Sequence, residues 1–360
     1  MSLDIASYRL NNQRLSQTNF TTPADVVSWL GAVQSQDFLG AKWALGLRAN
    51  GLTQADMDRA FADGSILRTH VLRPTWHFVT PADIRWLLAL TAPRVNALLK
   101  SMDRQLELDK PLLKQSNTIL EKTLRGGKFL TRAELGSALQ KRGINTDDLR
   151  LTHLVMHAEL DGVLCSGPRQ GKQFTYALLE ERAPQVKSLE SDEALLELTR
   201  RYFTSHGPAT LKDFTWWSGL SAAEVKRGLN MIQSELAHEI IEEQTYWFYS
   251  SSFNKPIHKA LLLPCYDEYT VGYTDRSAIY DTSHNSKLDA RGSFIAQYTI
   301  LLNGRVVGTW KRTLKKNLVA MEAVLFREVK KSEMHAIIEA AERYANFLGL
   351  PFSLDFAEAS

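Results

Sequence analysis

The chain has 360 residues, of which 44% are hydrophobic and 23% charged, a composition typical of a globular protein. No stretch approaches the roughly 18 consecutive apolar residues that a membrane-spanning helix requires, and we expect neither a signal peptide nor a membrane partner. The formal net charge of +3 is compatible with nucleic-acid binding without requiring it. Cys165 and Cys265 match no metal or redox spacing, so we expect a reduced, cytoplasmic protein without disulfides.

Helix-start signals recur along the chain. The tetrapeptide Thr-Pro-Ala-Asp occurs at 22–25 and at 80–83, where threonine can cap a helix, proline suits its first position and aspartate meets its positive end. Four further pairs have the spacing of a capping box, namely Thr53/Asp56, Thr131/Glu134, Thr210/Asp213 and Ser221/Glu224. Apolar residues at helical spacing predict the first helices at 23–33, 38–47 and 54–62.

Three segments share an order of helices followed by two short strands. Residues 126–182 and 190–252 each contain a helix, a turn, a longer helix and two strand-like stretches. Residues 1–80 contain helices followed by strand-type residues on both sides of Arg73-Pro74. Because this is the order of a winged helix-turn-helix, the sequence predicts three such domains, with a helical bridge at 81–125 between the first two.

The segment 258–360 has a different sequence pattern, with several strand-like stretches and one helix near 331–347. Asn303-Gly304 lies between two of these stretches and predicts a tight hairpin, since both residues tolerate positive φ. A small β-barrel or a curved sheet fits this pattern, and we predict the barrel. The expected fold class is therefore α+β, with three tandem winged helix-turn-helix domains followed by a C-terminal β-barrel.

Gln34 and Gln36 follow the first predicted helix, with Asp37 directly behind them. On a continuous helix, positions two apart point in nearly opposite directions. The chain must therefore turn or extend here if both amides are to reach one point. Taken alone, the two glutamines are explained by helix C-capping and turn polarity.

A set of short motifs occurs in order over nearly the whole chain. It comprises Gly31-Ala32-Val33-Gln34-Ser35-Gln36, Arg68-Thr69-His70, Arg73-Pro74-Thr75-x-His77, Leu263-Pro264, Asp267-Glu268-Tyr269, Gly272-Tyr273-x-Asp275-Arg276 and Asn303-Gly304-Arg305-Val306-Val307-Gly308-Thr309-Trp310. In this order and spacing, the chain resembles the winged-helix DNA glycosylases of the AlkZ and YcaQ type. The resemblance implies three tandem winged helices and a C-terminal β-barrel that together enclose double-stranded DNA.

The resemblance also implies that Gln34 and Gln36 are catalytic, because Gln34-Ser35-Gln36 matches the Gln-x-Gln motif of the AlkZ-like branch. The serine departs from the small or apolar residue that related members commonly carry. Asp37 is one position late for the Gln-x-Asp motif of the YcaQ-like branch, so we do not assign a catalytic carboxylate to it.

Two amides cannot act as a strong base, since they do not titrate near neutrality. They can hold a water molecule below a sugar C1′, which suffices if the leaving group is already good. An N7-alkylated guanine is cationic and is such a leaving group. No lysine nucleophile lies beside the motif, because Lys42 is past the turn. We therefore expect a monofunctional, monomeric DNA repair glycosylase without cofactor or metal, acting on N-alkylated purines in the nucleoid, with crosslinked purines as further candidates.

Basic and polar residues at several places are candidate DNA contacts. They are Arg68, His70, Arg73 and Thr75 on the predicted first hairpin, Arg169 and Lys172 on the second wing, Lys226 and Arg227 on a helix of the third unit, and Lys311 and Arg312 with Lys315 and Lys316 near the C-terminus. Solvated surface charge is the alternative for each cation, and a buried, hydrogen-bonded ring is the alternative for His70 and for His77.

Two other clusters have simpler interpretations. His153 and His157 have the i, i+4 spacing of zinc ligands, but no third ligand is evident, so we predict no metal site. Asp267 and Glu268 are expected at a strand end, where one of them forms a salt bridge with an arginine such as Arg276 at the seam between barrel and helices.

Two alternative functions remain open. Winged helices most often serve non-catalytic DNA binding, so a regulatory protein is the first alternative. An inactive relative that binds lesions or a toxic small molecule is the second. Three units with a C-terminal β-rich part, and the intact Gln34 and Gln36, favour the glycosylase over both.

Overall fold

The computed structural model describes residues 3–18, 20–147, 149–183, 189–250, 259–288 and 293–357. Its helices are α1 (Ile5–Asn12), α2 (Pro23–Leu30), α3 (Phe38–Gly46), α4 (Gln54–Asp63), α5 (Ile84–Gln105), α6 (Lys110–Leu124), α7 (Arg132–Gln140), α8 (Arg150–Leu160), α9 (Leu179–Arg182), α10 (Ser191–His206), α11 (Leu211–Ser218), α12 (Ala222–Ile232), α13 (Glu268–Val271) and α14 (Lys331–Leu348). Its strands are β1 (Val33–Gln34), β2 (Leu67–His70), β3 (Trp76–Val79), β4 (Leu130–Thr131), β5 (Leu164–Ser166), β6 (Thr175–Leu178), β7 (Ala237–Ile241), β8 (Gln244–Phe248), β9 (Ala260–Leu263), β10 (Thr299–Leu302), β11 (Arg305–Lys315), β12 (Leu318–Leu325) and β13 (Phe352–Ala357). The predicted domain limits at 1, 252, 258 and 360 lie outside the described residues.

The predicted capping boxes are confirmed at four helix starts. At α4, the Thr53 hydroxyl accepts from the Asp56 N–H, and the Asp56 carboxylate accepts from the Thr53 N–H. The same reciprocal bonds begin α7, α11 and α12. Thr22 also caps α2 as predicted, with Pro23 at the first helical position. Local chemistry therefore sets where these helices begin.

The second Thr-Pro-Ala-Asp tetrapeptide does not start a helix at its proline, so this prediction is wrong. Helix α5 begins at Ile84, after a turn in which the N–H groups of Asp83 and Ile84 donate to the Thr80 carbonyl. The Asp83 carboxylate accepts from Arg201 Nη1 at 2.6 Å and from Trp86 Nε1 at 3.0 Å. A tertiary partner, Arg201, together with the neighbouring Trp86, thus holds the acid that would otherwise serve the helix start.

One order of elements recurs three times: a helix, a short strand, two helices and two paired strands. The first copy is α2, β1, α3, α4, β2 and β3, with sheet order β1-β3-β2, and the second is α6, β4, α7, α8, β5 and β6, with the equivalent sheet order β4-β6-β5. In the third copy α10, α11 and α12 precede the β7–β8 hairpin, and a single bridge between Ala209 and Trp247 replaces the short strand. The identification of these copies as winged helix-turn-helix domains stays a prediction.

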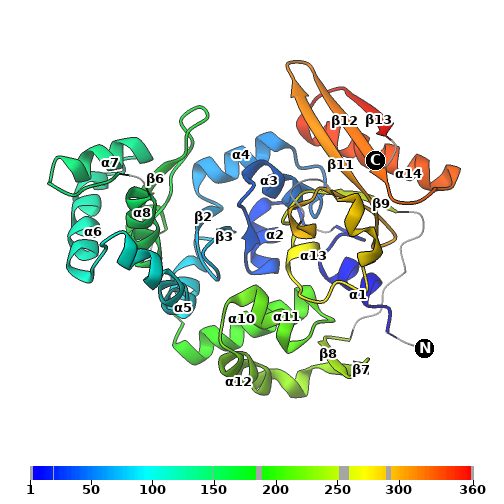
Figure 1. Cartoon of the computed structure of the whole chain (residues 1–360), viewed down its shortest axis with the longest axis horizontal. Helices are drawn as coiled ribbons and strands as arrows, with labels where there is room; N and C mark the ends of the chain where they lie inside the picture. Colours follow the sequence, from blue (N-terminus) through cyan, green and yellow to red (C-terminus); the bar gives the residue numbers. More distant parts are fainter. Residues whose placement is uncertain are drawn as a thin grey trace.

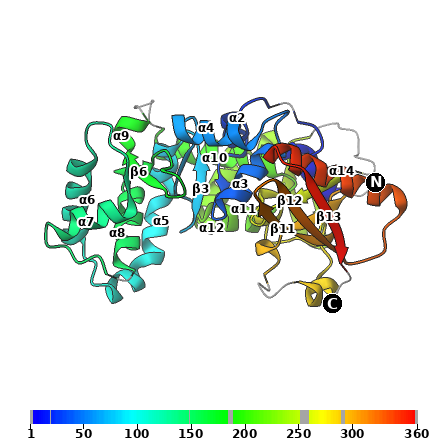
Figure 2. The same ribbon diagram turned by 90° about the horizontal axis from the view of Figure 1, so that it is seen from above.

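Two hydrophobic cores join the first copy to the C-terminal sheet and to the third copy, and the second copy has a further core built mainly from α6–α8. Figure 1 shows α6, α7 and α8 at one end of the molecule, the C-terminal sheet with α14 at the other, and α2–α4 between them; Figure 2 shows the same order end to end. One core joins α2–α4 to the C-terminal sheet and includes Val33. A second core joins the β2–β3 hairpin to α10–α12 and includes Ala32. The segment before Gln34 therefore lies where two cores meet.

The fold is α+β as predicted, but the expected β-barrel is wrong. The C-terminal strands lie in the order β13-β12-β11-β10-β9, and within the described residues neither β9 nor β13 pairs with a further strand, so the sheet is open. Helix α14 connects β12 to the parallel β13 and packs on the sheet through Ile337 and Tyr344. A helix that covers the apolar face removes the need for the sheet to close on itself. The predicted Asn303-Gly304 hairpin is confirmed, with φ of 51° and 82°.

Two further features are the length and apolarity of the helices and the burial of the two cysteines. In the described part of the chain, no helix is both long and apolar enough to cross a membrane. Cys165 and Cys265 are both buried. Burial raises the pKa of Cys165 to about 12, so this thiol is protonated near neutrality.

A buried ion pair joins the N-terminal helices to the start of α13. Asp267 accepts from Arg48 Nη2 at 2.8 Å and from Arg48 Nη1 at 2.9 Å, and Gln13 Oε1 accepts from the same guanidinium. The expected salt bridge to an arginine is confirmed, but the suggested residue, Arg276, is not the partner: its guanidinium donates to the carbonyls of Thr270 and Thr274. Arg48 is 219 positions away in sequence, so no local pattern indicated it.

We predict that Asp267→Asn lowers the free energy of unfolding by about 3 kcal/mol, because it leaves the buried Arg48 charge without its counter-ion. Asp192→Asn is the matched control, since it removes an acid that pairs with Arg227 at the surface, and it should change the free energy far less. Urea unfolding of the three proteins measures both changes. Equal effects of the two substitutions would contradict this account of the seam.

Candidate active site

Gln34 and Gln36 lie between α2 and α3, with Gln34 at the end of β1 and Gln36 at a bend two residues later. Helix α2 ends at Leu30, and Gly31 then adopts a φ of +81°, which lets the chain leave the helix sharply. Strand β1 pairs with β3, so that Gln34 lies opposite His77. The Ser35 N–H donates to the Trp76 carbonyl, and the Trp76 N–H donates to Gln36 Oε1, so Trp76 of β3 contacts both Ser35 and Gln36.

The two glutamines differ in how firmly they are held. Gln34 is buried; its Oε1 accepts from Arg73 Nη2 at 2.8 Å, and its N–H donates to Glu268 Oε1 at 2.8 Å. Gln36 is exposed, and its Oε1 accepts a long 3.4 Å hydrogen bond from the Trp76 N–H. Gln34 is thus fixed from two sides, whereas the Gln36 amide is open to a ligand.

Arg68 holds the backbone between the two glutamines. Its Nη2 donates to the Ser35 carbonyl at 3.1 Å, and its guanidinium lies over the rings of Trp76 and Phe174, 4.3 and 4.6 Å from their centroids. Burial lowers the pKa of Arg68 to about 10, so the group stays charged at neutral pH. A buried cation thereby fixes the backbone between Gln34 and Gln36.

Glu268 is a fully buried carboxylate below the backbone of Gln34. Besides the Gln34 N–H, it accepts from Trp217 Nε1 at 2.8 Å and from His206 Nε2 at 3.4 Å. Burial acts to raise the pKa of Glu268, but the hydrogen bonds from His206 and from the Gln34 N–H outweigh it and lower this pKa to about 2. The carboxylate is therefore ionised, and its negative charge lies next to the motif.

His77, opposite Gln34, is also fully buried. Its Nδ1 lies 3.0 Å from the Thr75 carbonyl, while no group in the described residues bonds to its Nε2. Burial, followed by the charge of Arg73, lowers the pKa of His77 to about 3. The ring is therefore neutral near pH 7 and carries no ionic proton to give to a departing base.

The other candidates on the first hairpin are partly withdrawn from solvent. His70 is buried and pairs with Glu159 of α8, which fits the expected alternative of a bonded core histidine. Arg73 and Thr75 lie near the hairpin tip and are half-buried, and the Arg73 guanidinium lies 5.4 Å from the centre of the Trp216 ring. Arg68 is buried as well. DNA contact by these residues stays a prediction.

The candidates of the second and third units differ in exposure. Arg169 is half-buried, and its Nη2 donates to the carbonyl of Lys172, whose own side chain is exposed. Lys226 and Arg227 are exposed on α12, and Arg227 Nη1 lies 2.8 Å from Asp192 Oδ1. Lys172 and Lys226 are therefore the more accessible cations of these two pairs.

The C-terminal basic residues follow β11 to its tip. Lys311, Lys315 and Lys316 are exposed, whereas Arg312 is half-buried, with its guanidinium 5.0 Å from the centre of the Tyr298 ring. The hairpin thus presents a series of lysines, and Arg312 packs against the protein.

Asp37, directly after the motif, is bound to the C-terminal part of the chain. Its Oδ2 accepts from the Tyr298 hydroxyl and from Cys265 Sγ, the latter at 3.4 Å. A Cβ on Gly40 would lie 2.7 Å from the same oxygen, so glycine is required there. Asp37 therefore anchors the start of α3. The anchoring roles of Asp37, Arg68 and Glu268 depend on partners distant in sequence, which spacing alone does not indicate.

One group of three potential metal-ligating side chains occurs among the described residues. Asp103 of α5 lies with His153 and His157 of α8, and one ligand atom from each falls within 4.8 Å of the others. The sequence showed no third ligand for the histidine pair, because Asp103 lies 50 positions before His153.

Comparisons with known proteins define the class of protein. The family model described as DNA glycosylase AlkZ-like matches residues 27–347. The chain is 25% identical over 367 residues to an interstrand DNA cross-link repair glycosylase of Streptomyces sahachiroi, with 96% of each covered. Its fold is similar to the solved structure of S. sahachiroi DNA glycosylase AlkZ, with a TM-score of 0.79, 23% identity and 98% of each chain covered.

The chain belongs to the AlkZ-like family of DNA glycosylases, because the family model spans most of its length. The resemblance seen in the sequence motifs is thereby confirmed, and DNA is the partner that membership implies. The lesion and the roles of individual residues are inferred from the chemistry of the site itself.

We predict that His77 makes the protein less stable in mild acid. Its pKa is near 6.5 in the unfolded chain and about 3 in the folded chain, so the unfolded state binds a proton that the folded state excludes. Stability from this group is present above pH 6.5 and is lost as the pH falls towards 3. Between pH 7 and pH 5 the wild-type free energy of unfolding should fall by about 2 kcal/mol more than that of His77→Gln. Identical pH dependence of the two proteins would refute this burial effect.

Proposed function

We propose that this protein is a monofunctional DNA glycosylase that hydrolyses the N-glycosidic bond of N-alkylated purines, in particular N7-alkylguanines, and leaves an abasic site. The observation that carries the proposal is the Gln34-Ser35-Gln36 segment, which Arg68, Arg73 and Glu268 hold in place. Such rigid support is what a site needs when it acts by positioning rather than by proton transfer.

The two amides suit the attack of water on a good leaving group. Gln34 Oε1 already accepts one hydrogen bond from Arg73, which leaves a second lone pair for a water molecule, and the exposed Gln36 amide can bind the same water. As water attacks C1′, a C–O bond forms and the C1′–N9 bond breaks. The bonding electrons neutralise the cationic purine, and the proton of the water passes to solvent.

The charges around the motif fit this reaction. Positive charge develops on the sugar as the base departs, and the ionised Glu268 supplies a fixed negative charge beside Gln34. His77 is neutral, which agrees with a leaving group that needs no protonation. The neutral amides also fit a cationic lesion, since they bind water without forming an ion pair with the damaged base.

We further propose that the three repeated units are winged helix-turn-helix domains and that the protein binds double-stranded DNA as a monomer. Figure 1 shows the β5–β6 turn and the β11–β12 turn projecting in the same direction, with α3 and α4 between them. Lys172 lies at the first turn, and Lys315 and Lys316 lie at the second. Phosphate contacts at these turns and from Lys226, Arg227, Lys311 and Arg312 predict binding that weakens as salt rises.

The test uses a duplex with one N7-methylguanine, incubated with enzyme and then treated with alkali to cleave abasic sites. Gln34→Ala and Gln36→Ala should each lower the single-turnover rate by roughly 100-fold, because the water loses one of its two holders. DNA affinity should stay within about threefold of wild type. Gln115→Ala, which removes an exposed glutamine of α6, is the matched control and should leave the rate unchanged.

A parallel duplex with an N7-guanine interstrand crosslink tests the wider substrate range. The curated relative is named for the repair of such crosslinks, and release of the crosslink by this protein would extend the proposal to bulky lesions. Tight binding of both duplexes without strand cleavage would favour a non-catalytic, regulatory DNA-binding protein. Cleavage that survives both glutamine substitutions would place the chemistry elsewhere.

A further inference from the structure

Asp103, His153 and His157 form a buried cluster outside the catalytic segment. His153 and His157 lie one turn apart on α8 and therefore point to the same side of the helix. Asp103 Oδ1, from α5, lies 3.2 Å from His153 Nδ1 and 3.0 Å from His157 Nε2. The three side chains are 6 to 13% exposed.

These separations match those between ligands of a tetrahedral zinc ion. Metal–ligand distances of 2.0–2.1 Å at tetrahedral angles place neighbouring ligand atoms about 3.3 Å apart. Two imidazoles and one carboxylate are also a recurrent set of three protein ligands. The same separations suit hydrogen bonds from two neutral imidazoles to a carboxylate, so the surroundings must decide between the two.

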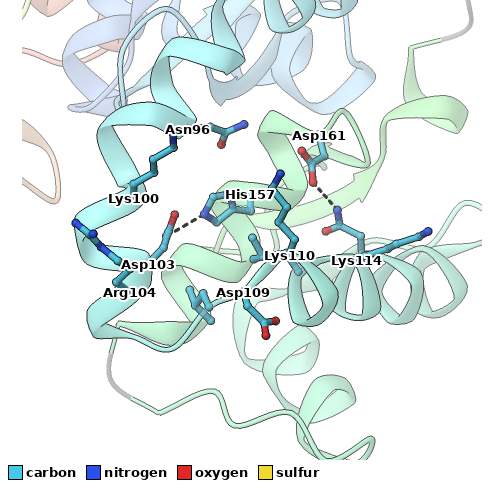
Figure 3. Close-up of a pocket in the computed structure, with 12 residues that line it drawn as sticks. Asn96, Lys100, Asp103, Arg104, Asp109, Lys110, Lys114, His157 and Asp161 are labelled. Carbon is cyan, nitrogen blue, oxygen red and sulfur yellow. Dashed lines mark hydrogen bonds and ion pairs between the residues drawn. The ribbon is translucent and has the colours of Figure 1, made fainter.

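The surroundings favour an ion with an open coordination position. Asp103 and His157 line a cavity of about 690 Å³ between α5, α6 and α8 (Figure 3). Two amide oxygens that line it, Asn96 Oδ1 and Asn117 Oδ1, are buried without a hydrogen-bond partner in the described structure. A water bound to a metal ion would be a strong donor to an acceptor that faces the same cavity.

The charged residues that line the cavity indicate which fourth ligand would complete the coordination of the metal ion. Lys100, Arg104, Lys110 and Lys114 line it together with the acids Asp103, Asp109 and Asp161. A divalent ion adds positive charge to this lining, so an ionised water is the favoured fourth ligand. We propose that Asp103, His153 and His157 bind one Zn²⁺, with a hydroxide or water facing the cavity.

The site is independent of the proposed catalytic motif, because none of its three ligands bonds to Gln34 or Gln36 in the described structure. It would instead link α5 to α8. The next turn of α8 carries Glu159, which pairs with His70 of the β2–β3 hairpin. Bound zinc should therefore stabilise the helical support of that hairpin without entering the reaction.

The test begins with the full chain, freed of metal by a chelator and dialysed. Calorimetric titration with Zn²⁺ should show one equivalent bound, together with a higher melting temperature. Co²⁺ should give the visible bands of a tetrahedral site without the intense near-ultraviolet band of thiolate ligation. Asp103→Asn and, separately, His157→Gln should weaken binding roughly tenfold or more.

His335→Gln is the matched control, since His335 forms an exposed i, i+4 pair with Glu339 on α14 that could bind metal adventitiously. It should leave the titration unchanged. Absence of stoichiometric binding by the wild type, binding that persists in both ligand variants, or a thiolate band would overturn the proposal. The cobalt spectrum of the wild type decides the matter even if a ligand variant fails to fold.

Discussion

The ionised carboxylate of Glu268 is the contact on which the arrangement of the active site depends. Glu268 begins α13, which lies between β9 and β10 of the C-terminal sheet in the chain, and it accepts hydrogen bonds from Gln34 of the first repeat and from His206 and Trp217 of the third. The buried carboxylate needs these hydrogen-bond donors, because an unpaired buried charge costs far more free energy than the loss of an ion pair at the surface. Three parts of the chain are thus held together at the backbone of Gln34, and Asp267 next to it fixes α13 through Arg48.

The proposed catalytic segment is a local departure from the repeated pattern of the fold. In the second repeat, Thr131 is both the last residue of β4 and the N-cap of α7, so that strand and helix join directly. In the third repeat, Thr210 caps α11 immediately after the bridged residue Ala209. The first repeat instead places residues 35–37 between β1 and α3. Gln36 lies on this added segment, which has no counterpart in the other two repeats.

Sequence reasoning succeeded where the chemistry is local. Threonine and serine caps, the Asn303-Gly304 hairpin and the resemblance carried by Gln34-Ser35-Gln36 each involve residues that are close in the chain. It failed where partners are distant: Arg48 replaces Arg276 opposite Asp267, Asp103 joins the two histidines of α8, and α14 covers a sheet that was expected to close. Strand patterns identify strands but do not determine whether the edges of their sheet meet.

The most direct test of the account compares Glu268→Gln with wild type in single-turnover excision of N7-methylguanine and in DNA affinity. The substitution removes the charge and turns one acceptor towards the Gln34 backbone into a donor, so the rate should fall roughly 100-fold while affinity changes little. Trp217→Phe removes one hydrogen bond to the carboxylate but keeps the carboxylate charge, so it should lower the excision rate less than Glu268→Gln does. A folded Glu268→Gln protein that excises the base at the wild-type rate would contradict the claim that this carboxylate positions the catalytic glutamines.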